Sequence, residues 1–332
     1  MPAFIKGISY YLPETIVTNE QLVREFPEWT VEKIAEKVGV NQRHMAGDET
    51  ISDMAVKASE KLFAEYPEIL REDIDFVIVC TQSPDYFLPS TACLVQARLG
   101  LPTACGAYDF DLGCSGYEYG LAMAKGFIAA GIAKNVLLIT SEAYNKHIHP
   151  RDKGNRTIFG DAATATVIST DGFAEIGEFN LGTDGKGAEN LIVKTGGMRN
   201  PKPLKDLTFD ENGNPVSSDY LFMNGPEIFS FTLKVVPRMV KDVLAKSGLV
   251  KDNIDLFVFH QANKYMLTFL RKKLKIDEDK FFVNMDEIGN TVSSTIPIAL
   301  ADAKSAGLLH GKVLIAGFGV GLSWGATILT CE

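Results

Sequence analysis

The chain is expected to be an α/β protein made of two similar halves, and three observations lead to this expectation. Short β-branched apolar runs, such as residues 74–80, have the length of parallel strands buried on both faces, and helical patterns lie between them. The same order of strands and helices then occurs a second time along the chain. With 332 residues, 46% of them hydrophobic, the chain can bury a large core. We therefore predict two βαβ-type halves with mostly parallel sheets, packed about a pseudo-twofold axis.

Strands and helices alternate through the first half. Residues 51–66 carry their apolar side chains on one helical face. Gly39 and Gly131 are plausible helix ends, because glycine readily adopts the left-handed conformation that follows many helices. The expected strands are 4–9, 74–80, 107–112, 135–141 and 159–169, and the expected helices are 19–26, 31–38, 51–66, 91–99 and a last one that begins near Cys114 and ends at Gly131.

The second half repeats this order at nearly constant offsets. The motif IDLFVFH matches IDFVIVC in hydrophobicity, which puts His260 180 positions (260 − 80) after Cys80. Asn290 lies 176 positions (290 − 114) after Cys114. Two unrelated domains would not be expected to share such spacing, so the pattern indicates an internal duplication.

The predicted boundary lies near residues 170–173, which gives an amino-terminal half of residues 1–172 and a carboxy-terminal half of residues 173–332. Residues 196–226 are rich in Gly, Pro, Asn and Lys and lack periodicity, so we expect an excursion loop or lid. The remaining elements expected in the second half are helices at 227–247 and 294–306 and strands at 254–260, 280–285, 306–317 and 323–331.

Composition excludes several classes of protein. The net charge of −9 disfavours nucleic-acid binding, which needs a basic surface. We find no signal peptide and no apolar run near the ~20 residues of a membrane span, so no membrane association is expected. Five cysteines without zinc-type spacing indicate reduced thiols in the cytoplasm. The His147/His149 pair has no neighbouring ligand cluster and is expected to lie in a loop, so no metal site is predicted.

Cys114 is a candidate nucleophile. It follows a strand and opens a helix rich in small residues, which places it in the first turn. There, the unpaired backbone N–H groups and the helix dipole favour a thiolate. The alternative is a small buried apolar residue, which is the usual state of an intracellular cysteine, and position alone does not decide between the two.

His260 and Asn290 are expected to lie beside Cys114. All three residues fall at the carboxyl ends of strands or at the helix starts that follow, where ligands bind in α/β sheets. Taken alone, His260 could be a satisfied core histidine and Asn290 a helix cap. A papain-like protease has a similar Cys, His, Asn order, but its nucleophile lies near the mature amino terminus, whereas 113 residues precede Cys114. Three reactive groups arriving together favour an active site.

Over essentially its whole length the sequence resembles the β-ketoacyl-acyl-carrier-protein synthase III family of the thiolase superfamily. The resemblance rests on the motifs DLGCSG, LPSTAC, FGDAA, HQAN, GNTVSSTIP and GFGVGLSWG. It implies the thiolase-like fold, with layers in the order α-β-α-β-α. It also implies a decarboxylative Claisen condensation of an acyl group with malonyl-acyl-carrier protein, in fatty-acid or specialised lipid or polyketide synthesis.

The resemblance assigns a role to each candidate residue. Cys114 would take an acyl group from an acyl-CoA or acyl-carrier-protein thioester. The backbone N–H groups of Cys114 and Val320 would form the oxyanion hole, and His260 and Asn290 would donate hydrogen bonds to the enolate. Only thioester substrates are implied, with no further cofactor. The family also implies a homodimer.

A basic helical face is predicted just after HQAN. Lys264, Arg271 and Lys275 are spaced as on one face, while Met266, Phe269, Leu270 and Leu274 are expected on the other. Such a face would suit an acidic carrier protein, and the alternative is an ordinary solvated helix.

Some positions depart from the family pattern. Where family members carry a tryptophan and an arginine that hold the CoA nucleotide, this chain has Lys33 and Lys37, and Lys153 replaces a further arginine. Lysine can bind phosphate but does not stack flat on adenine. Leu88 stands where the family often has a phenylalanine that closes the acyl pocket across the dimer, which predicts room for a longer or different acyl chain.

Three alternatives remain at this point. An acyltransferase could use the same acyl-cysteine without decarboxylation. A 3-hydroxy-3-methylglutaryl-CoA synthase would need a catalytic glutamate, for which Glu118 is available, although the GNT motif favours the condensing type. A non-catalytic, carrier-protein-binding partner subunit would not need Cys, His and Asn together.

Overall fold

The computed structural model describes residues 1–211 and 213–332, and its first half contains a five-stranded half-sheet. The strand order is β5-β4-β6-β7-β1, in which β4 pairs in parallel with β5 and β6, and β7 pairs antiparallel with β6 and β1. The main elements are β1 (Phe4–Tyr11), α3 (Ile51–Glu65), β4 (Phe76–Cys80), α4 (Thr91–Arg98), β5 (Gly106–Phe110), α5 (Gly116–Ala129), β6 (Val136–Glu142) and β7 (Ala162–Ser169).

The second half repeats this arrangement in the order β14-β13-β15-β16-β8. Here β13 pairs in parallel with β14 and β15, and β16 pairs antiparallel with β15 and β8. The elements are β8 (Ala174–Thr183), α7 (Gly225–Lys246), β13 (Leu256–Phe259), α8 (Lys264–Leu274), β14 (Phe281–Phe282), α9 (Thr295–Ser305), β15 (Gly311–Gly319) and β16 (Ser323–Cys331). The duplicated α/β fold is therefore confirmed, whereas each half-sheet is mixed because its reversed strand, β7 or β16, makes antiparallel pairs.

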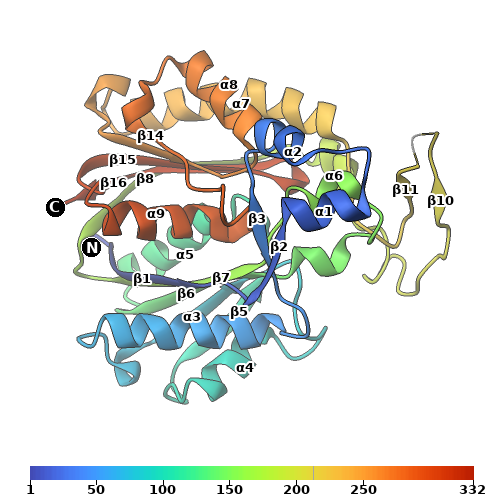
Figure 1. Cartoon of the computed structure of the whole chain (residues 1–332). Helices are drawn as coiled ribbons and strands as arrows, with labels where there is room; N and C mark the ends of the chain where they lie inside the picture. Colours follow the sequence, from blue (N-terminus) through green and yellow to red (C-terminus); the bar gives the residue numbers. More distant parts are fainter. Residues whose placement is uncertain (212) are drawn as a thin grey trace.

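The two half-sheets form separate layers with helices between and outside them. They join through a short antiparallel pairing of β1 with β8, at Phe4 with Glu175 and Ile5 with Ala174. Figure 1 shows α5 and α9 between the half-sheets, α7 and α8 over one outer face, and α3 and α4 over the other. The division of the chain at residue 172 falls between β7 and β8, and its assignment as a domain boundary stays a prediction.

The small residues of α5 follow from its central position. A Cβ atom at Gly120 would lie 2.5 Å from the Leu138 side chain, and one at Gly116 would lie 2.3 Å from Cys80 Sγ. Glycine at these positions lets the helix approach β6 and β4 more closely than any larger residue could.

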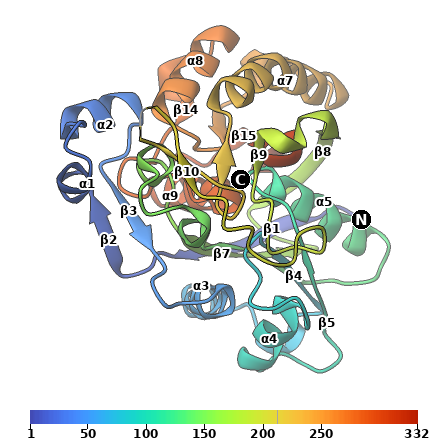
Figure 2. The ribbon, with the colours of Figure 1, turned by 90° about the vertical axis from the view of Figure 1, so that its right-hand side faces the viewer.

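Shorter elements surround this frame. The two-stranded antiparallel sheet of β2 (Thr15–Thr18) and β3 (Gln42–Met45) encloses α1 (Asn19–Glu25) and α2 (Val31–Lys37) in the chain, and α6 (Lys153–Arg156) follows β6. The predicted lid carries two small sheets, which pair β10 (Thr208–Phe209) with β11 (Pro215–Val216) and β12 (Phe222–Met223) with β9 (Leu191–Ile192). Residue 212 of the predicted lid lies outside the described residues. Figure 1 shows β10 and β11 projecting from the body, and Figure 2 looks onto them from that side.

Several predicted strands are shorter than expected. The strand predicted at 280–285 is reduced to β14, and β7 begins at Ala162 instead of residue 159. Phe159 makes an isolated parallel bridge with Asn290, so this part of the chain pairs across the two halves before the strand starts. Within the described residues, the structure holds no helix of the length and apolar character that a bilayer crossing requires.

Candidate active site

Cys114 lies in the tight turn between β5 and α5. Ser115 is the N-cap of α5, so Cys114 comes immediately before the cap and not within the first helical turn as predicted. Its side chain is only 7% exposed. The backbone of Gly319, at the end of β15, approaches so closely that a Cβ atom there would lie 2.7 Å from Cys114 Sγ. The end of β15 from the second half therefore covers the thiol contributed by the first half.

The electrostatics of this thiol differ from the prediction. Burial, together with the nearby carboxyl group of Glu142, raises the pKa of Cys114 to about 12, and Glu118 adds to the rise. Hydrogen bonds from the backbone N–H groups of Val320 and of Cys114 itself act in the opposite direction and lower the pKa. The expectation of a resting thiolate is thus overturned, because desolvation of the charged form outweighs the backbone dipoles.

The same two N–H groups show where negative charge can be held. The sequence predicted Cys114 and Val320 as the oxyanion hole, and both N–H groups are directed at the sulfur region. Burial also raises the pKa of Glu118 and of Glu142 well above the usual carboxyl range. This favours neutral carboxyl groups and so weakens their repulsion of a developing anion.

His260 directly follows β13 and is 2% exposed. Its backbone N–H donates to the Ala316 carbonyl at 2.9 Å, which continues the pairing of β13 with β15. Its ring Nδ1 lies 2.8 Å from Thr295 Oγ1, and the ring packs edge-on against Phe318 with centroids 5.7 Å apart. Burial lowers the pKa of His260 to about 3, so the imidazole is neutral at physiological pH.

Asn290 is held on both its backbone and its side chain. Its backbone N–H donates to the Ile158 carbonyl, and its own carbonyl accepts from Gly160 N–H at 3.0 Å. The side-chain Oδ1 accepts from Val292 N–H at 2.9 Å, and Nδ2 donates to the Ala262 carbonyl at 3.3 Å. These contacts fix the amide orientation and leave one N–H of Nδ2 for a ligand.

The structure brings the three predicted residues together through a short series of contacts. His260 packs on Phe318, which precedes Gly319, and Gly319 packs on Cys114. Asn290 holds Val292, whose buried side chain belongs to the same apolar cluster as Cys114.

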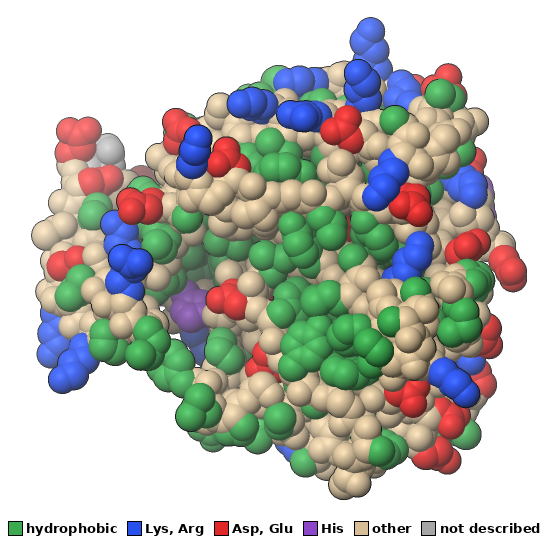
Figure 3. Space-filling view, turned by 180° about the vertical axis from the view of Figure 1, so that it is seen from behind, with side chains coloured by type: hydrophobic (Ala, Val, Ile, Leu, Met, Phe, Trp, Pro, Cys, Tyr) green, Lys and Arg blue, Asp and Glu red, His purple; other side chains and the backbone are tan. Residues whose placement is uncertain are grey.

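A cavity of about 880 Å³ lies beside this cluster. Tyr144, Leu191, Leu221 and Val320 contribute both to the cavity wall and to the apolar packing around Cys114. Lid residues, including Pro203 and Asp219, line its other side. Figure 3, from behind, shows a hollow at the base of the projecting segment.

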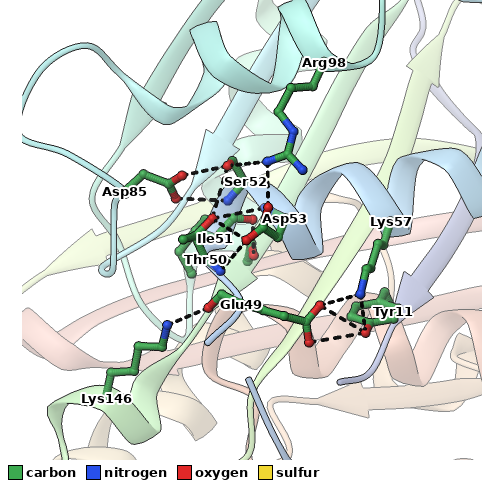
Figure 4. A network of polar contacts seen from close by, with 11 residues as sticks. Tyr11, Glu49, Thr50, Ile51, Ser52, Asp53, Lys57, Asp85, Arg98 and Lys146 are labelled. Carbon is green, nitrogen blue, oxygen red and sulfur yellow. Dashed lines mark hydrogen bonds and ion pairs between the residues drawn. The ribbon is translucent and has the colours of Figure 1, made fainter. Parts of the chain in front are cut away.

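A polar network holds one wall of this cavity (Figure 4). Asp85 accepts hydrogen bonds from the Ser52 N–H at 3.0 Å and from the Ser52 hydroxyl at 2.6 Å. Arg98 then contacts both the Ser52 hydroxyl, at 2.7 Å, and Asp53, at 2.9 Å, while Asp53 forms the capping box of α3 with Thr50. The network ties the 83–90 loop to the start of α3.

Two buried carboxyl groups were missed as parts of the site. Glu142, the last residue of β6, accepts from the Gln82 N–H and the Ser83 hydroxyl and, across the two halves, from the Ser293 hydroxyl at 3.3 Å. The sequence feature that could have identified Glu142 is a charged residue at the end of a strand with no other charged residue. Glu118, considered only as the glutamate of another enzyme class, is fully buried behind Cys114, where Gly317 leaves room for it.

The predicted nucleotide-contacting lysines lie on neighbouring surface elements. Lys153 Nζ pairs with Glu28 at 2.7 Å, and Lys33 lies 4.9 Å from the centre of the Trp29 ring. Lys37 is exposed at the end of α2. Trp29 is an aromatic residue in this region that the sequence analysis did not use.

The basic face predicted on α8 is only partly present. Lys264 and Lys275 are exposed, whereas Arg271 is half-buried and pairs with Glu278 at 3.1 Å. Phe269, expected on the buried face, is 39% exposed and packs against Phe229 of α7. The buried face of the helix differs from the predicted one, because it is formed by Met266, Leu267 and Leu270.

Leu88, the predicted acyl-pocket residue, is 85% exposed and is absent from the described cavity wall. Its neighbours Tyr86 and Phe87 line that wall. Leu88 therefore does not line the cavity of its own chain, and its predicted role across a dimer stays a prediction.

The sequence and the fold both match known proteins. The profile of 3-oxoacyl-[acyl-carrier-protein (ACP)] synthase III matches residues 108–185, and the profile of its C-terminal region matches residues 244–331. The β-ketoacyl-[acyl-carrier-protein] synthase III of Clostridium perfringens is 37% identical over 326 residues, which cover 97% of each chain. That of Streptococcus gordonii is 37% identical over 99% of each chain.

Solved structures agree with this relationship. A 3-oxoacyl-(acyl-carrier-protein) synthase III superimposes with a TM-score of 0.96 at 46% identity, over 99% of this chain and 100% of the other. A 3-oxoacyl-(acyl-carrier protein) synthase from Burkholderia xenovorans gives 0.90 at 38% identity, over 100% and 95%. The chain therefore belongs to the β-ketoacyl-acyl-carrier-protein synthase III family.

Proposed function

We propose that this protein transfers an acyl group from a thioester to Cys114 and then condenses it with a malonyl group carried by acyl-carrier protein, with loss of carbon dioxide. The observation that carries this proposal is one buried site that joins a thiol, two backbone N–H groups, a neutral imidazole and a fixed amide. A neutral imidazole and an amide can donate hydrogen bonds to an enolate without changing their own charge.

In the first step, Cys114 attacks the thioester carbonyl and releases the donor thiol. The resting Cys114 is a thiol because its pKa is raised, and its proton passes to the departing donor sulfur as the new thioester forms. The N–H groups of Cys114 and Val320 hold the oxygen that becomes negative. Loss of one such donor typically costs about 3–4 kcal/mol of transition-state stabilisation. The two N–H groups together are therefore the main electrostatic contribution to this step.

In the second step, the malonyl carboxylate leaves as carbon dioxide and its electron pair forms an enolate. His260 and Asn290 donate to the enolate oxygen, and the enolate carbon attacks the acyl-cysteine carbonyl. The Cys114 sulfur then leaves as a thiolate and takes a proton from solvent, while the β-ketoacyl product remains a thioester on the carrier protein. Apart from this proton, every group in the scheme belongs to the chain or to its thioester substrates, so we propose no further cofactor.

The cavity supports an acyl group larger than acetyl. Its volume of about 880 Å³ and its apolar wall at Leu191, Leu221 and Val320 would accommodate a chain of several carbons. We propose that Lys33, Lys37 and Lys153 contact donor phosphates, and that the exposed Lys264 and Lys275 contact the acidic carrier protein, with the paired Arg271 contributing less.

We also propose a homodimer acting in the cytoplasm. β5 is at one end of the ten-stranded sheet, and its Tyr108 and Phe110 are only partly buried. Tyr108 packs with Phe76 and Phe127 in an aromatic group. Figure 3 shows apolar side chains gathered on the face opposite to that of Figure 1. The five free cysteines suit a reducing compartment.

The test is the intact mass of the protein after exposure to a panel of acyl-CoA and acyl-carrier-protein donors, beside Cys114→Ala. One acyl increment on the native protein, absent from the variant, is expected, and addition of malonyl-acyl-carrier protein should then release carbon dioxide. Acylation without carbon dioxide release would instead identify a non-decarboxylating acyltransferase. If no donor acylates the protein, the remaining explanation is a non-catalytic subunit that binds a carrier protein.

A further inference from the structure

The role of His260 depends on which ring nitrogen carries the single proton of its neutral imidazole. To donate to an enolate, the ring must carry hydrogen on the nitrogen that faces the substrate. Nδ1 is already engaged, since it lies 2.8 Å from Thr295 Oγ1. The substrate-facing nitrogen is then Nε2, and the proton must reside there if the proposed function, on which this inference rests, is correct.

The Thr295 hydroxyl has two possible acceptors and one proton. Besides Nδ1 of His260, its Oγ1 lies 3.1 Å from the Val292 carbonyl oxygen. If the hydroxyl donates to Val292, Nδ1 must carry the imidazole proton and Nε2 is bare. If it donates to Nδ1, Nε2 carries the proton. The direction of this one hydroxyl therefore decides whether His260 can act as a donor.

The surrounding contacts favour donation to His260. The Val292 carbonyl already accepts the backbone N–H of Thr295, so it does not need the hydroxyl. The contact between Oγ1 and Nδ1 of the buried His260 ring is also the shorter of the two, at 2.8 Å against 3.1 Å. Donation from the hydroxyl to Nδ1 also leaves the imidazole hydrogen on Nε2, where the proposed condensation needs a donor.

We propose that Thr295 is a positioning residue that donates its hydroxyl proton to Nδ1 of His260 and thereby fixes the imidazole as an Nε2–H donor. The same turn orients the second donor, because Val292 N–H holds Oδ1 of Asn290 and so turns the amide N–H groups away. Val292 adopts a φ of +57°, which β-branched residues rarely do. One unusual turn, residues 292–295, thus sets both enolate donors.

The direct test is nitrogen-15 NMR of the histidine rings at neutral pH. The chain has five histidines, and the His260 signals are those lost in His260→Gln. Native protein is expected to show Nδ1 unprotonated and Nε2 protonated. A native spectrum with protonated Nδ1 would overturn the proposal, whatever the activity proves to be.

The second test measures the two half-reactions separately in Thr295→Val and Thr295→Ser. The control is Thr232→Val, which removes another buried hydroxyl, one that donates to the Ile228 carbonyl of its own helix. In Thr295→Val, acylation of Cys114 should persist while carbon dioxide release from malonyl-acyl-carrier protein falls on the order of ten- to a hundredfold. The His260 signals should also shift toward protonated Nδ1. Thr295→Ser and Thr232→Val should retain the native rate and ring signals.

Native-rate condensation in folded Thr295→Val would overturn the positioning role. If Thr295→Val does not fold, the ring spectra of the native protein and of Thr295→Ser still test the proposal. A serine variant that loses the Nε2–H signal contradicts it. Failure of the native protein to acylate or to release carbon dioxide refutes the proposed function instead, and the ring spectrum remains a separate result.

Discussion

Asn290→Asp should separate the geometry of the active site from its hydrogen-bond donors. Aspartate matches asparagine in shape, and its oxygen can still accept the Val292 N–H that now lies 2.9 Å from Oδ1. What it loses is the Nδ2 amide, which donates to the Ala262 carbonyl at 3.3 Å and keeps one N–H for substrate. The single substitution therefore removes one enolate donor while the backbone contacts of residue 290 remain.

The expected magnitude follows from these contacts. Loss of one donor to a developing oxyanion lowers the rate by about 10²–10³. Loss of the long Ala262 contact should destabilise the fold by ~1 kcal/mol while the new carboxyl is neutral, and by more once it ionises. Because residue 290 is buried, the new carboxyl should have a raised pKa, and its neutral form carries an O–H that can donate. The defect should thus shrink as pH falls through that pKa and grow as pH rises above it.

The assay measures carbon dioxide release from malonyl-acyl-carrier protein by enzyme already acylated on Cys114, across a range of pH. Asn224→Asp is the matched control, because Asn224 caps α7 and aspartate is an equally good cap. Acylation should be nearly unchanged in both variants. Condensation by Asn290→Asp within about threefold of native at alkaline pH, far from the loss expected for a missing donor, would refute the assigned role of the amide.

Three further outcomes are expected. Gly319→Ala should reduce acylation on the order of a hundredfold with the fold intact, because its Cβ would lie 2.7 Å from Cys114 Sγ and displace the sulfur; unchanged mass labelling would show that the thiol can shift freely. Alkylation of Cys114 by iodoacetamide should rise about tenfold per pH unit up to its pKa of about 12, since only the thiolate reacts, and a plateau near neutral pH would contradict a raised pKa. The raised pKa of Cys114 also affects stability. The buried thiol contributes its full stabilisation below the pKa of an unfolded cysteine, and this contribution is lost as pH rises toward 12. Asp219→Asn should speed limited proteolysis of the lid without changing the main thermal transition, because Asp219 accepts the N–H groups of Leu204 and Lys205; equal cleavage rates would mean that this carboxylate does not hold the lid.

The duplicated architecture could be predicted because its signals are local. A run such as IDFVIVC has the hydrophobicity of a buried strand wherever it occurs, and its echo 180 positions later (260 − 80) marked the repeat. The same repeat paired Cys114 with Asn290 and placed His260 on their side of the sheet. Family membership followed from the motifs around these residues, and the comparisons confirm it.

Errors arose where the answer depended on neighbours distant in sequence. The stripe of α8 was misjudged at Phe269 because helical spacing allows several faces, and only packing against α7 and α2 selects one. Arg271 was predicted to belong to an open basic face, but it is paired with Glu278, which lies beyond the end of the helix.

The sequence by itself determined the order of elements, the internal duplication and the identity of the three candidate reactive residues, because periodicity and motif spacing are properties of the chain. Only the tertiary structure decided the direction of the Cys114 pKa shift and the environment of His260. Both depend on desolvation and on groups such as Glu142 and Thr295, which reach the site from other elements. Burial and Coulomb interactions act through space, so no local pattern could have fixed their sum.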